Sequence, residues 1–268
     1  DSVKELMRVN KINALPILND SRQVVGLYML NELLEPEQRQ KLMIIMAGGQ
    51  GTRLRPHTEN CPKPMLPVGG KPMLEHIIER AKDQGFSHFI LSIHYLGHMV
   101  QEYFGDGSKW QVKIEYLIED SPLGTAGGLY LLKNKVGKIF FVSNCDILTN
   151  FSYKDLLDFH NTNKNDFTLV ASTKNFPIPY GVCELKKKGT LKKIKEKPNL
   201  DFLVSIGLYL MNKKILSLIK KDSFLDMSDL INKLQIKKYK VGVFPIDDSS
   251  WTDVGEWSKY EQTLKSYD

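Results

Sequence analysis

The chain has 268 residues, of which 42% are hydrophobic and 25% are charged, so it can bury a substantial core and has the charge content of an ordinary globular protein. No apolar run is long enough to cross a bilayer, and the first residues form no apolar signal segment. The three cysteines, Cys61, Cys145 and Cys183, are widely spaced, which argues against a disulfide framework and a zinc site. We therefore expect a protein of the reducing cytoplasm with no membrane partner.

The formal net charge is +6, and much of the excess lies in the lysine-rich stretch 184–198. A basic balance is compatible with nucleic acid, a membrane surface or small phosphorylated substrates as partners. The stretch contains few aromatic residues and no nucleic-acid motif, so we expect no nucleic-acid partner. We interpret most of its lysines as the solvated face of a hairpin.

Residues 1–37 read as a separate piece. The pattern predicts a strand at 14–18, an Asn-Asp turn, a second strand at 24–28 and a short helix at 30–34. This succession resembles the second half of a CBS module, which in the full protein would bind a regulatory nucleotide. Half a module cannot close its own core, so we expect it to pack on the rest of the chain or on a partner copy, or to be the remainder of a truncated module.

A second piece is predicted at 41–268, and in it apolar strand patterns alternate with helical ones. The predicted strands are 42–47, 88–95, 113–118, 139–143 and 167–172, and the predicted helices are 72–84, 97–104, 125–133 and 153–163. Further along, the pattern predicts a hairpin of 182–185 and 191–194 and two strands at 202–210 and 241–246. Strands that alternate with helices predict an α/β fold with a mainly parallel sheet.

A glycine-rich stretch follows the first predicted strand of this piece, and its sequence at 44–72 is IIMAGGQGTRLRPHTENCPKPMLPVGGKP. In an open α/β sheet, ligands bind beyond the carboxyl ends of the strands. The glycines let backbone N–H groups approach an anion closely, and Arg53, Arg55 and Lys63 add positive charge. The stretch therefore suits a polyphosphate.

Two common phosphate loops do not fit this stretch. A P-loop needs Gly-Lys followed by Ser or Thr, and no such sequence follows these glycines. A dinucleotide fingerprint needs a third glycine where Leu54 stands, and it leads at once into a helix. Here four prolines keep the chain extended instead.

The succession A-G-G-x-G-T-R-L-x-P, P-K-P and G-G-K-P resembles the signature of the sugar nucleotidyltransferases, which join a sugar 1-phosphate to a nucleoside triphosphate and release pyrophosphate. The resemblance continues through SPLGTAGGL, FFVSNCDIL, YGVCEL, EKP, SIGLYLM and SWTDVG, and so covers about 210 residues. It implies a Rossmann-like α/β fold of the GT-A type. Such a fold has a mixed, mainly parallel sheet flanked by helices, with an additional β-hairpin region that binds the sugar.

The resemblance also implies roles for individual residues. The catalytic set would be Arg53, Lys63, Asp146 and Asp253, with the two aspartates as ligands of Mg²⁺. The residues that would bind the nucleotide are Ala47, Gly48, Gly49, Gly51, Thr52, Arg53, Glu119, Leu123, Gly124 and Thr125. The residues that would bind the sugar phosphate are Gly181, Glu196, Lys197 and Ser205.

The segment LGTAG at 123–127 is similar to that of guanylyltransferases, so we expect GTP as the nucleotide. Guanine presents N1–H and N2–H₂ donors, for which Glu119 and Asp120 are candidate acceptors.

Two positions depart from the family pattern. Cys145 stands where a glycine usually precedes the metal-binding aspartate, which puts the local backbone conformation in question. Ser205 stands where an asparagine usually touches the sugar, which leaves the sugar preference open.

The CBS-like segment in front of this piece resembles the arrangement of glucosamine-1-phosphate guanylyltransferases in legionaminic acid pathways. We therefore expect glucosamine 1-phosphate as the second substrate, with mannose 1-phosphate or another hexose 1-phosphate as the alternative. A non-catalytic protein that senses nucleotide sugars is a hypothesis of another class, although the catalytic set is complete.

Asp253 by itself would also fit the N-cap of a following helix. A homodimer is compatible with the sequence, which does not fix the oligomeric state.

Overall fold

The computed structural model describes residues 41–119 and 121–254 and, nearer the N-terminus, Met7 and residues 9–10, 12–19 and 21–29. Three predictions lie outside the described residues. They are the helix at 30–34, a role for Asp120, and a helix after Asp253 that this residue would cap.

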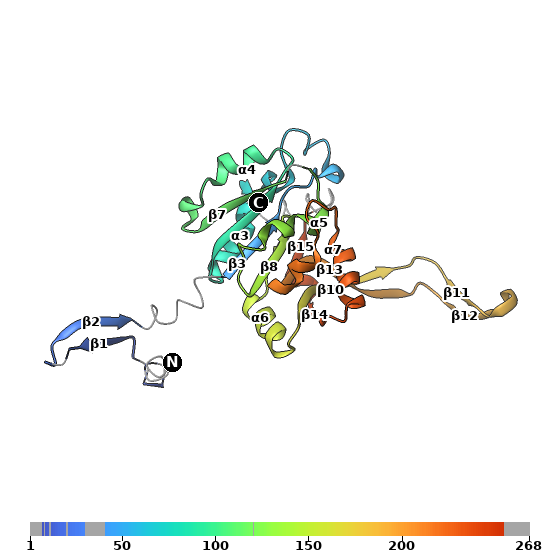
Figure 1. Ribbon diagram of the computed structural model, residues 1–268. Coiled ribbons are helices and arrows are strands. Elements are labelled where there is room, and N and C mark those ends of the chain that lie inside the picture. Colours follow the sequence, from blue (N-terminus) through green and yellow to red (C-terminus); the bar gives the residue numbers. More distant parts are fainter. Residues whose placement is uncertain are drawn as a thin grey trace.

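A seven-stranded mixed sheet forms the centre of the molecule (Figure 1). Its strands, in their order across the sheet, are β14 (Val241–Ile246), β10 (Phe167–Pro177), β13 (Asn199–Asn212), β8 (Ile139–Asn144), β3 (Lys41–Met46), β6 (Phe86–Ile93) and β7 (Lys113–Ile118). Neighbouring strands are parallel except at β13, which runs antiparallel to both β10 and β8. The predicted α/β fold with a mainly parallel sheet is confirmed.

Helices cover both faces of this sheet, and the two layers follow from the alternation of side chains along each strand. Met43 and Ile45 of β3 point to one face, and Leu42 and Ile44 to the other. The first face packs against α3 (Met73–Asp83), α4 (Gly97–Phe104) and α6 (Tyr153–Thr162). The second packs against α5 (Gly124–Gly127), the 3-10 segments η4 (Gly128–Leu132) and η6 (Lys213–Leu218), and α7 (Met227–Ile236).

Most predicted elements of this domain are present. Every strand predicted after residue 41 is found, and the helices at 72–84, 97–104 and 153–163 are found within one residue at each end. The helix predicted at 125–133 differs, because only one α-helical turn forms before the chain tightens into η4. A Cβ on Gly127 would lie 2.5 Å from the carbonyl oxygen of Ser223, so the glycines that this close packing requires also weaken a regular helix.

Several short pairings complete the fold. β9 (Ile147–Thr149) pairs antiparallel with β15 (Trp251–Asp253), and β4 (Pro67–Val68) pairs antiparallel with β5 (Lys71–Pro72). Near the N-terminus, β1 (Ala14–Leu18) and β2 (Val24–Met29) form a two-stranded sheet of their own, so the two strands predicted there are confirmed.

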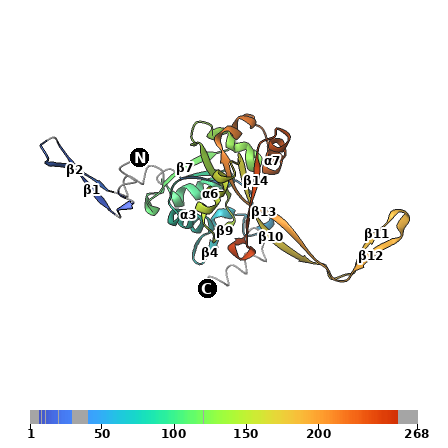
Figure 2. The same cartoon turned by 90° about the horizontal axis from the view of Figure 1, so that it is seen from below.

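A two-stranded ribbon projects from the seven-stranded sheet. β10 and β13 continue beyond the sheet and lead into the predicted hairpin, β11 (Val182–Leu185) and β12 (Leu191–Lys195). In two perpendicular views this ribbon points away from the body of the molecule (Figures 1 and 2). We call residues 173–203 the arm.

The three cysteines are free, and Cys145 is buried, Cys61 is half-buried and Cys183 is exposed. Within the part of the chain that the structure describes, no helix combines the length and the apolar character needed to span a membrane.

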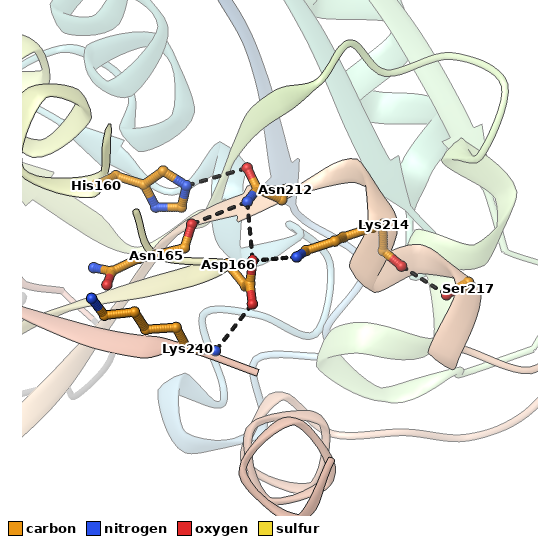
Figure 3. A network of polar contacts seen from close by, with 7 residues as sticks. All are labelled: His160, Asn165, Asp166, Asn212, Lys214, Ser217 and Lys240. Carbon is orange, nitrogen blue, oxygen red and sulfur yellow. Dashed lines mark hydrogen bonds and ion pairs between the residues drawn. The ribbon is translucent and has the colours of Figure 1, made fainter. Parts of the chain in front are cut away.

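A polar network ties α6 to the beginning of β10 and the end of β13 (Figure 3). His160 is only 1% exposed, and its Nε2 lies 3.3 Å from Asn212 Oδ1 while its Nδ1 lies 2.8 Å from Thr168 Oγ1. Asn212 also donates to the carboxylate of Asp166, which pairs with Lys214. Burial lowers the pKa of His160, while the bond to Asn212 and the charge of Asp166 act in the opposite direction.

This lowered pKa predicts a loss of stability in mild acid. Below pH 6.5, the usual pKa of histidine, the unfolded chain takes up a proton that the folded chain excludes, so the free energy of unfolding falls as the pH drops further. Urea unfolding at pH 7.5 and 5.5 should show a smaller pH-dependent loss for His160→Gln than for the wild type. The exposed His98→Gln is the matched control, and an equal loss in wild type and His160→Gln would contradict the prediction.

Candidate functional site

A cavity of about 420 Å³ lies beyond the carboxyl ends of β3 and β8, where an open α/β sheet binds its ligands. It is lined by the glycine-rich loop, by the start of α5 and by the loop before α7. The lining residues are Met46, Gly48, Gly49, Gly51, Thr52, Arg53, Lys63, Glu119, Pro122, Leu123, Gly124, Thr125, Asn144, Cys145, Asp146, Phe224 and Asp226. Eleven of the predicted site residues therefore line a single cavity.

The glycine-rich loop is fixed by a close approach at Gly51. This residue has a φ of 63°, and a Cβ on it would lie 2.9 Å from Thr58 Cγ2 and 3.1 Å from Lys63 Cβ. Thr58 holds the turn by donating from Oγ1 to the Gly51 carbonyl oxygen at 2.8 Å. A 3-10 turn, η1 (Thr52–Leu54), follows and buries Leu54 in a small core, which leaves Arg53 exposed at the cavity.

Lys63 packs beside this loop, next to Gly51. It begins the 3-10 turn η2 (Lys63–Met65), with Pro62 as an extended N-cap and Pro64 inside the turn. Its ammonium group forms an ion pair with the carboxylate of Asp146, and the two side chains are only 11% and 15% exposed. The flanking prolines thus fix the backbone from which the largely buried Lys63 ammonium reaches Asp146, just after β8.

Asp146 and Asp253 lie on two segments that are held against each other. Asp146 lies between β8 and β9, and the register of β9 with β15 places Asp253 opposite Ile147. The Val254 amide donates to the Asp146 carbonyl oxygen at 3.0 Å, which fixes the two segments together. Asp253 is half-buried and is not among the cavity-lining residues, whereas Asp146 is.

The two aspartates offer oxygen ligands, which fit a magnesium ion better than a zinc ion. The described residues contain no group of three or more His, Cys, Asp or Glu side chains that would form an all-protein metal site. Mg²⁺ is usually held by one or two carboxylates together with phosphate oxygens and water, so Asp146 and Asp253 suffice when a polyphosphate is bound. The donor set of the described site therefore fits Mg²⁺.

Cys145 replaces a glycine without straining the backbone. The described non-glycine residues with positive φ do not include it, so no left-handed conformation is needed at this position. Its thiol is buried, and burial together with the neighbouring Asp146 charge raises its pKa to about 12. The thiol is thus neutral and acts as a small packing residue beneath the carboxylate.

Two further carboxylates line the cavity, those of Glu119 and Asp226. Glu119 is 7% exposed, and its carboxylate accepts from Ser92 Oγ at 2.5 Å and from the Leu123 amide at 3.3 Å. Asp226, from the loop before α7, accepts from the Thr125 amide at 3.2 Å. A base with several N–H donors would therefore meet acceptors here.

The start of α5 and the start of α7 are built on each other. Gly124 has a φ of 75°, and a Cβ on it would lie 2.7 Å from the Leu225 carbonyl oxygen. That carbonyl oxygen accepts from the amides of Ala126 and Gly127, and the Met227 amide donates to Thr125 Oγ1 at 2.8 Å. The hydroxyl of Thr125 therefore helps to begin α7, in addition to lining the cavity.

Six lining residues were not among the predicted site residues. They are Met46, Pro122, Asn144, Cys145, Phe224 and Asp226. An acidic residue followed by the apolar spacing of Met227, Leu230 and Leu234 is a helix signal that could have indicated α7. Nothing in the sequence shows that this helix begins against Gly124, because that contact joins segments 101 positions apart.

The remaining predicted site residues lie outside the lining of this cavity. Ala47 is 1% exposed and belongs to the core, with its amide donating to the Ser92 carbonyl oxygen at 2.7 Å. Ser205 lies on β13, two residues before Gly207, whose positive φ lets it pack against the Asn144 side chain at the cavity edge. The other three predicted sugar-phosphate residues lie on the arm, and they are Gly181, Glu196 and Lys197.

Known proteins with related sequences include mannose-1-phosphate guanylyltransferases. Mannose-1-phosphate guanylyltransferase 1 of Arabidopsis thaliana is 31% identical over 233 residues, which are 84% of this chain and 64% of that protein. The mannose-1-phosphate guanylyltransferase of Mycobacterium tuberculosis is 32% identical over 220 residues, which are 79% of this chain and 60% of that protein. The chain thus spans a little under two thirds of the length of these relatives.

Solved structures with the same fold include HddC from Yersinia pseudotuberculosis, with a TM-score of 0.67 and 24% identity over 85% of this chain and 100% of that one. A putative glucose-1-phosphate thymidylyltransferase from Bacillus anthracis also has a TM-score of 0.67 and 24% identity, over 84% of this chain and 95% of that one. A sequence model of the family described as Nucleotidyl transferase matches residues 42–268. The cavity beyond the sheet, the glycine-rich loop and this match together show that the chain belongs to the nucleotidyl transferase family.

Proposed function

We propose that this chain transfers the guanylyl group of GTP to a hexose or hexosamine 1-phosphate and releases pyrophosphate. The observation that carries the proposal is that one cavity brings together two chemically different sets of groups. Arg53 and Lys63 line it together with Asp146, and so do the carboxylates of Glu119 and Asp226. A nucleoside triphosphate combines a polyanion, which suits the cations, with a base whose hydrogen-bond donors suit the carboxylates.

At the phosphate end, the problem is repulsion between two anionic substrates. An oxygen of the sugar 1-phosphate attacks the α-phosphorus of the nucleotide, and the bond to pyrophosphate breaks in line. That oxygen is already anionic, so the chain needs to supply positions and charges rather than a strong base. The guanidinium of Arg53 suits two oxygens of the leaving pyrophosphate, and the ammonium of Lys63 suits the reacting phosphates.

Mg²⁺ held by Asp146 and Asp253 would supply further neutralisation of the phosphate charge. In the described structure the carboxylate of Asp146 pairs with Lys63. This ion pair anchors both the proposed metal ligand, Asp146, and the proposed phosphate ligand, Lys63. It therefore keeps the two groups together at the cavity.

At the base end, the acceptors favour guanine. The Glu119 carboxylate accepts hydrogen bonds from Ser92 and Leu123, whereas the Asp226 carboxylate accepts, among the described residues, from Thr125 alone. Phe224 is 64% exposed at the cavity and offers an aromatic face to a base. We assign N1–H and N2–H₂ of guanine to these two carboxylates.

Two considerations bear on the sugar. The names of the relatives favour mannose 1-phosphate, and the CBS-like pattern of the first 37 residues favours glucosamine 1-phosphate. We keep both as candidates, with Ser205 as the residue nearest the cavity edge among those proposed for the sugar. The N-terminal segment would add a regulatory nucleotide site in a longer protein, and a cytoplasmic location is part of the same proposal.

The proposal predicts turnover with a defined pair of substrates. We expect pyrophosphate release with Mg²⁺, GTP and either mannose 1-phosphate or glucosamine 1-phosphate, and much slower release with ATP, UTP or dTTP, because those bases do not present the same donors. A matrix of nucleotides and sugar phosphates, with products identified by mass spectrometry, measures this. No release with GTP and any sugar phosphate, together with tight GTP binding, would instead indicate a nucleotide sensor.

Removing either member of the ion pair should abolish most activity. Lys63→Ala and Asp146→Ala should each lower kcat by about 100-fold or more, since each removes a charge that acts on the reacting phosphates. Circular dichroism establishes that the variants are folded. Lys138→Ala, an exposed residue just before β8 and outside the cavity, is the matched control, and near wild-type kcat in Lys63→Ala would remove the role that we give to Lys63.

Asp226 should control nucleotide selectivity. If its carboxylate accepts from the guanine 2-amino group, the wild type prefers GTP to ITP, which lacks that group, and Asp226→Asn lowers the preference by roughly tenfold. The ratio of kcat/KM for the two nucleotides is the readout, because a general loss of folding or of α7 lowers both values together. An unchanged ratio would limit Asp226 to its contact with Thr125.

A further inference from the structure

Ser92 is a polar residue in an apolar part of the sheet. It lies near the end of β6 and is fully buried, with Met46 of β3 and Leu117 of β7 opposite it in the register of the strands. Among the described contacts, its hydroxyl bonds only to Glu119, whose carboxylate accepts from it at 2.5 Å. A buried hydroxyl without a partner is costly, and a hydrogen bond to a carboxylate is strong, so the two side chains depend on each other.

The Glu119 carboxylate is bonded on both of its oxygens. Oε1 accepts from the Ser92 hydroxyl, and Oε2 accepts from the Leu123 amide at 3.3 Å. Gly128 lies against Oε1, because a Cβ at that position would be only 2.5 Å away. Donors prefer the plane of the carboxylate, so one donor on each oxygen fixes the orientation of that plane. A carboxylate accepts about four hydrogen bonds, so capacity remains for a ligand in the cavity that Glu119 lines.

The backbone of Glu119 is held by the two residues that follow Ser92. Its amide donates to the Ile93 carbonyl oxygen at 3.2 Å, and its carbonyl oxygen accepts from His94 Nδ1 at 2.8 Å. A carbonyl oxygen only accepts, so Nδ1 is the nitrogen of His94 that carries the proton in this bond. The end of β6 therefore holds Glu119 at its amide, its carbonyl group and its carboxylate.

A carboxylate in a fixed orientation can distinguish two purine bases at a single atom. Guanine presents a hydrogen-bond donor at N1, whereas adenine presents an acceptor there. A carboxylate that is held toward N1 accepts from guanine and excludes adenine, because two facing acceptors leave both without a hydrogen bond. A carboxylate that can turn away from N1 loses part of both effects. The discrimination therefore depends on the bonds that fix the carboxylate.

This discrimination is chemically separate from the one that we assign to Asp226. The 2-amino group distinguishes GTP from ITP, whereas N1 distinguishes both of these from ATP, because hypoxanthine keeps the N1–H of guanine. The described hydrogen bonds of the Asp226 carboxylate come from Thr125, on the other side chain pair that lines the cavity. A change at Ser92 should therefore alter the comparison of GTP with ATP and not that of GTP with ITP.

We propose that Ser92 is a positioning residue for nucleotide selection, whose hydroxyl holds the Glu119 carboxylate toward N1 of the bound purine. The inference rests on the proposed function for its ligand, a purine nucleoside triphosphate with its base beside Glu119. Ser92 is buried and is not among the residues that line the cavity, so it touches no substrate and acts through Glu119.

Nucleotide binding in the absence of a sugar phosphate tests the proposal. Isothermal titration calorimetry with Mg²⁺ gives Kd for GTP, ITP and ATP. Ser92→Ala should lower the preference for GTP over ATP by about tenfold, because the carboxylate loses one of its two donors. The preference for GTP over ITP should stay within about twofold of the wild type, since it depends on a different group. An unchanged preference for GTP over ATP would overturn the proposal.

The matched control is Ser172→Ala. Ser172 is also fully buried, lies on β10 of the same sheet and donates to a carboxylate, that of Asp248, at 3.5 Å, but it does not line the cavity. Its preference for GTP over ATP should equal that of the wild type. Ser92→Cys is a second variant, which fills the site but offers only a weak donor, so it should lose the preference as Ser92→Ala does. A full preference in Ser92→Cys would show that volume rather than the hydrogen bond matters, and would overturn the proposal.

A double-mutant cycle separates positioning from a general loss of stability. Glu119→Gln should by itself lower the preference for GTP over ATP, since an amide can donate to N1 of adenine. Ser92→Ala added to Glu119→Gln should change the ratio no further, because Ser92 acts through the carboxylate. Equal losses from Ser92→Ala in both backgrounds would overturn the positioning role.

Failure of the proposed function would give a different result. A wild type that binds GTP more tightly than ATP but releases no pyrophosphate with any sugar phosphate would contradict the transfer, while the binding ratios still decide the role of Ser92. A wild type that binds ATP as tightly as GTP would contradict both the guanine assignment and the proposal for Ser92.

Discussion

The ion pair between Lys63 and Asp146 is the interaction around which the candidate site is arranged. It joins segments 83 positions apart, and its two side chains are only 11% and 15% exposed. A largely buried charge without a partner is costly, so each group holds the other in place. The prolines beside Lys63 and the pairing of β9 with β15 beside Asp146 position the two groups for this ion pair. Opposite charges are therefore brought together beyond the carboxyl end of β8.

Close backbone approaches determine the other end of the cavity. Gly124 brings the start of α5 against the Leu225 carbonyl oxygen, and a Cβ on Gly128 would lie 2.5 Å from Glu119 Oε1. These contacts place Asp226 and Glu119 on the same cavity, although they come from different loops. The 3-10 geometry that follows α5 is the cost of this packing.

The arm shows that a sheet can position a surface as well as a pocket. β10 and β13 are core strands at one end and exposed ribbon at the other, so the direction of the arm is set by the same hydrogen-bond ladder that builds the sheet. Most of its described apolar side chains are exposed, in contrast to those of β3, which pack on both faces. A core and an exposed ribbon thus share two strands.

The sequence by itself determined the α/β fold, the strand order along the chain and the family, because alternating periodicity and a long ordered signature are local properties. It also predicted Arg53, Lys63 and Asp146 as site residues, and the structure places all three on one cavity. Only the tertiary structure decided that Phe224 and Asp226 line the cavity and that Cys145 is tolerated without a left-handed backbone. It likewise decided that Glu196 lies on a projecting arm. These facts depend on contacts between distant segments and on the direction of a strand pair in space, and no local pattern of residues encodes them.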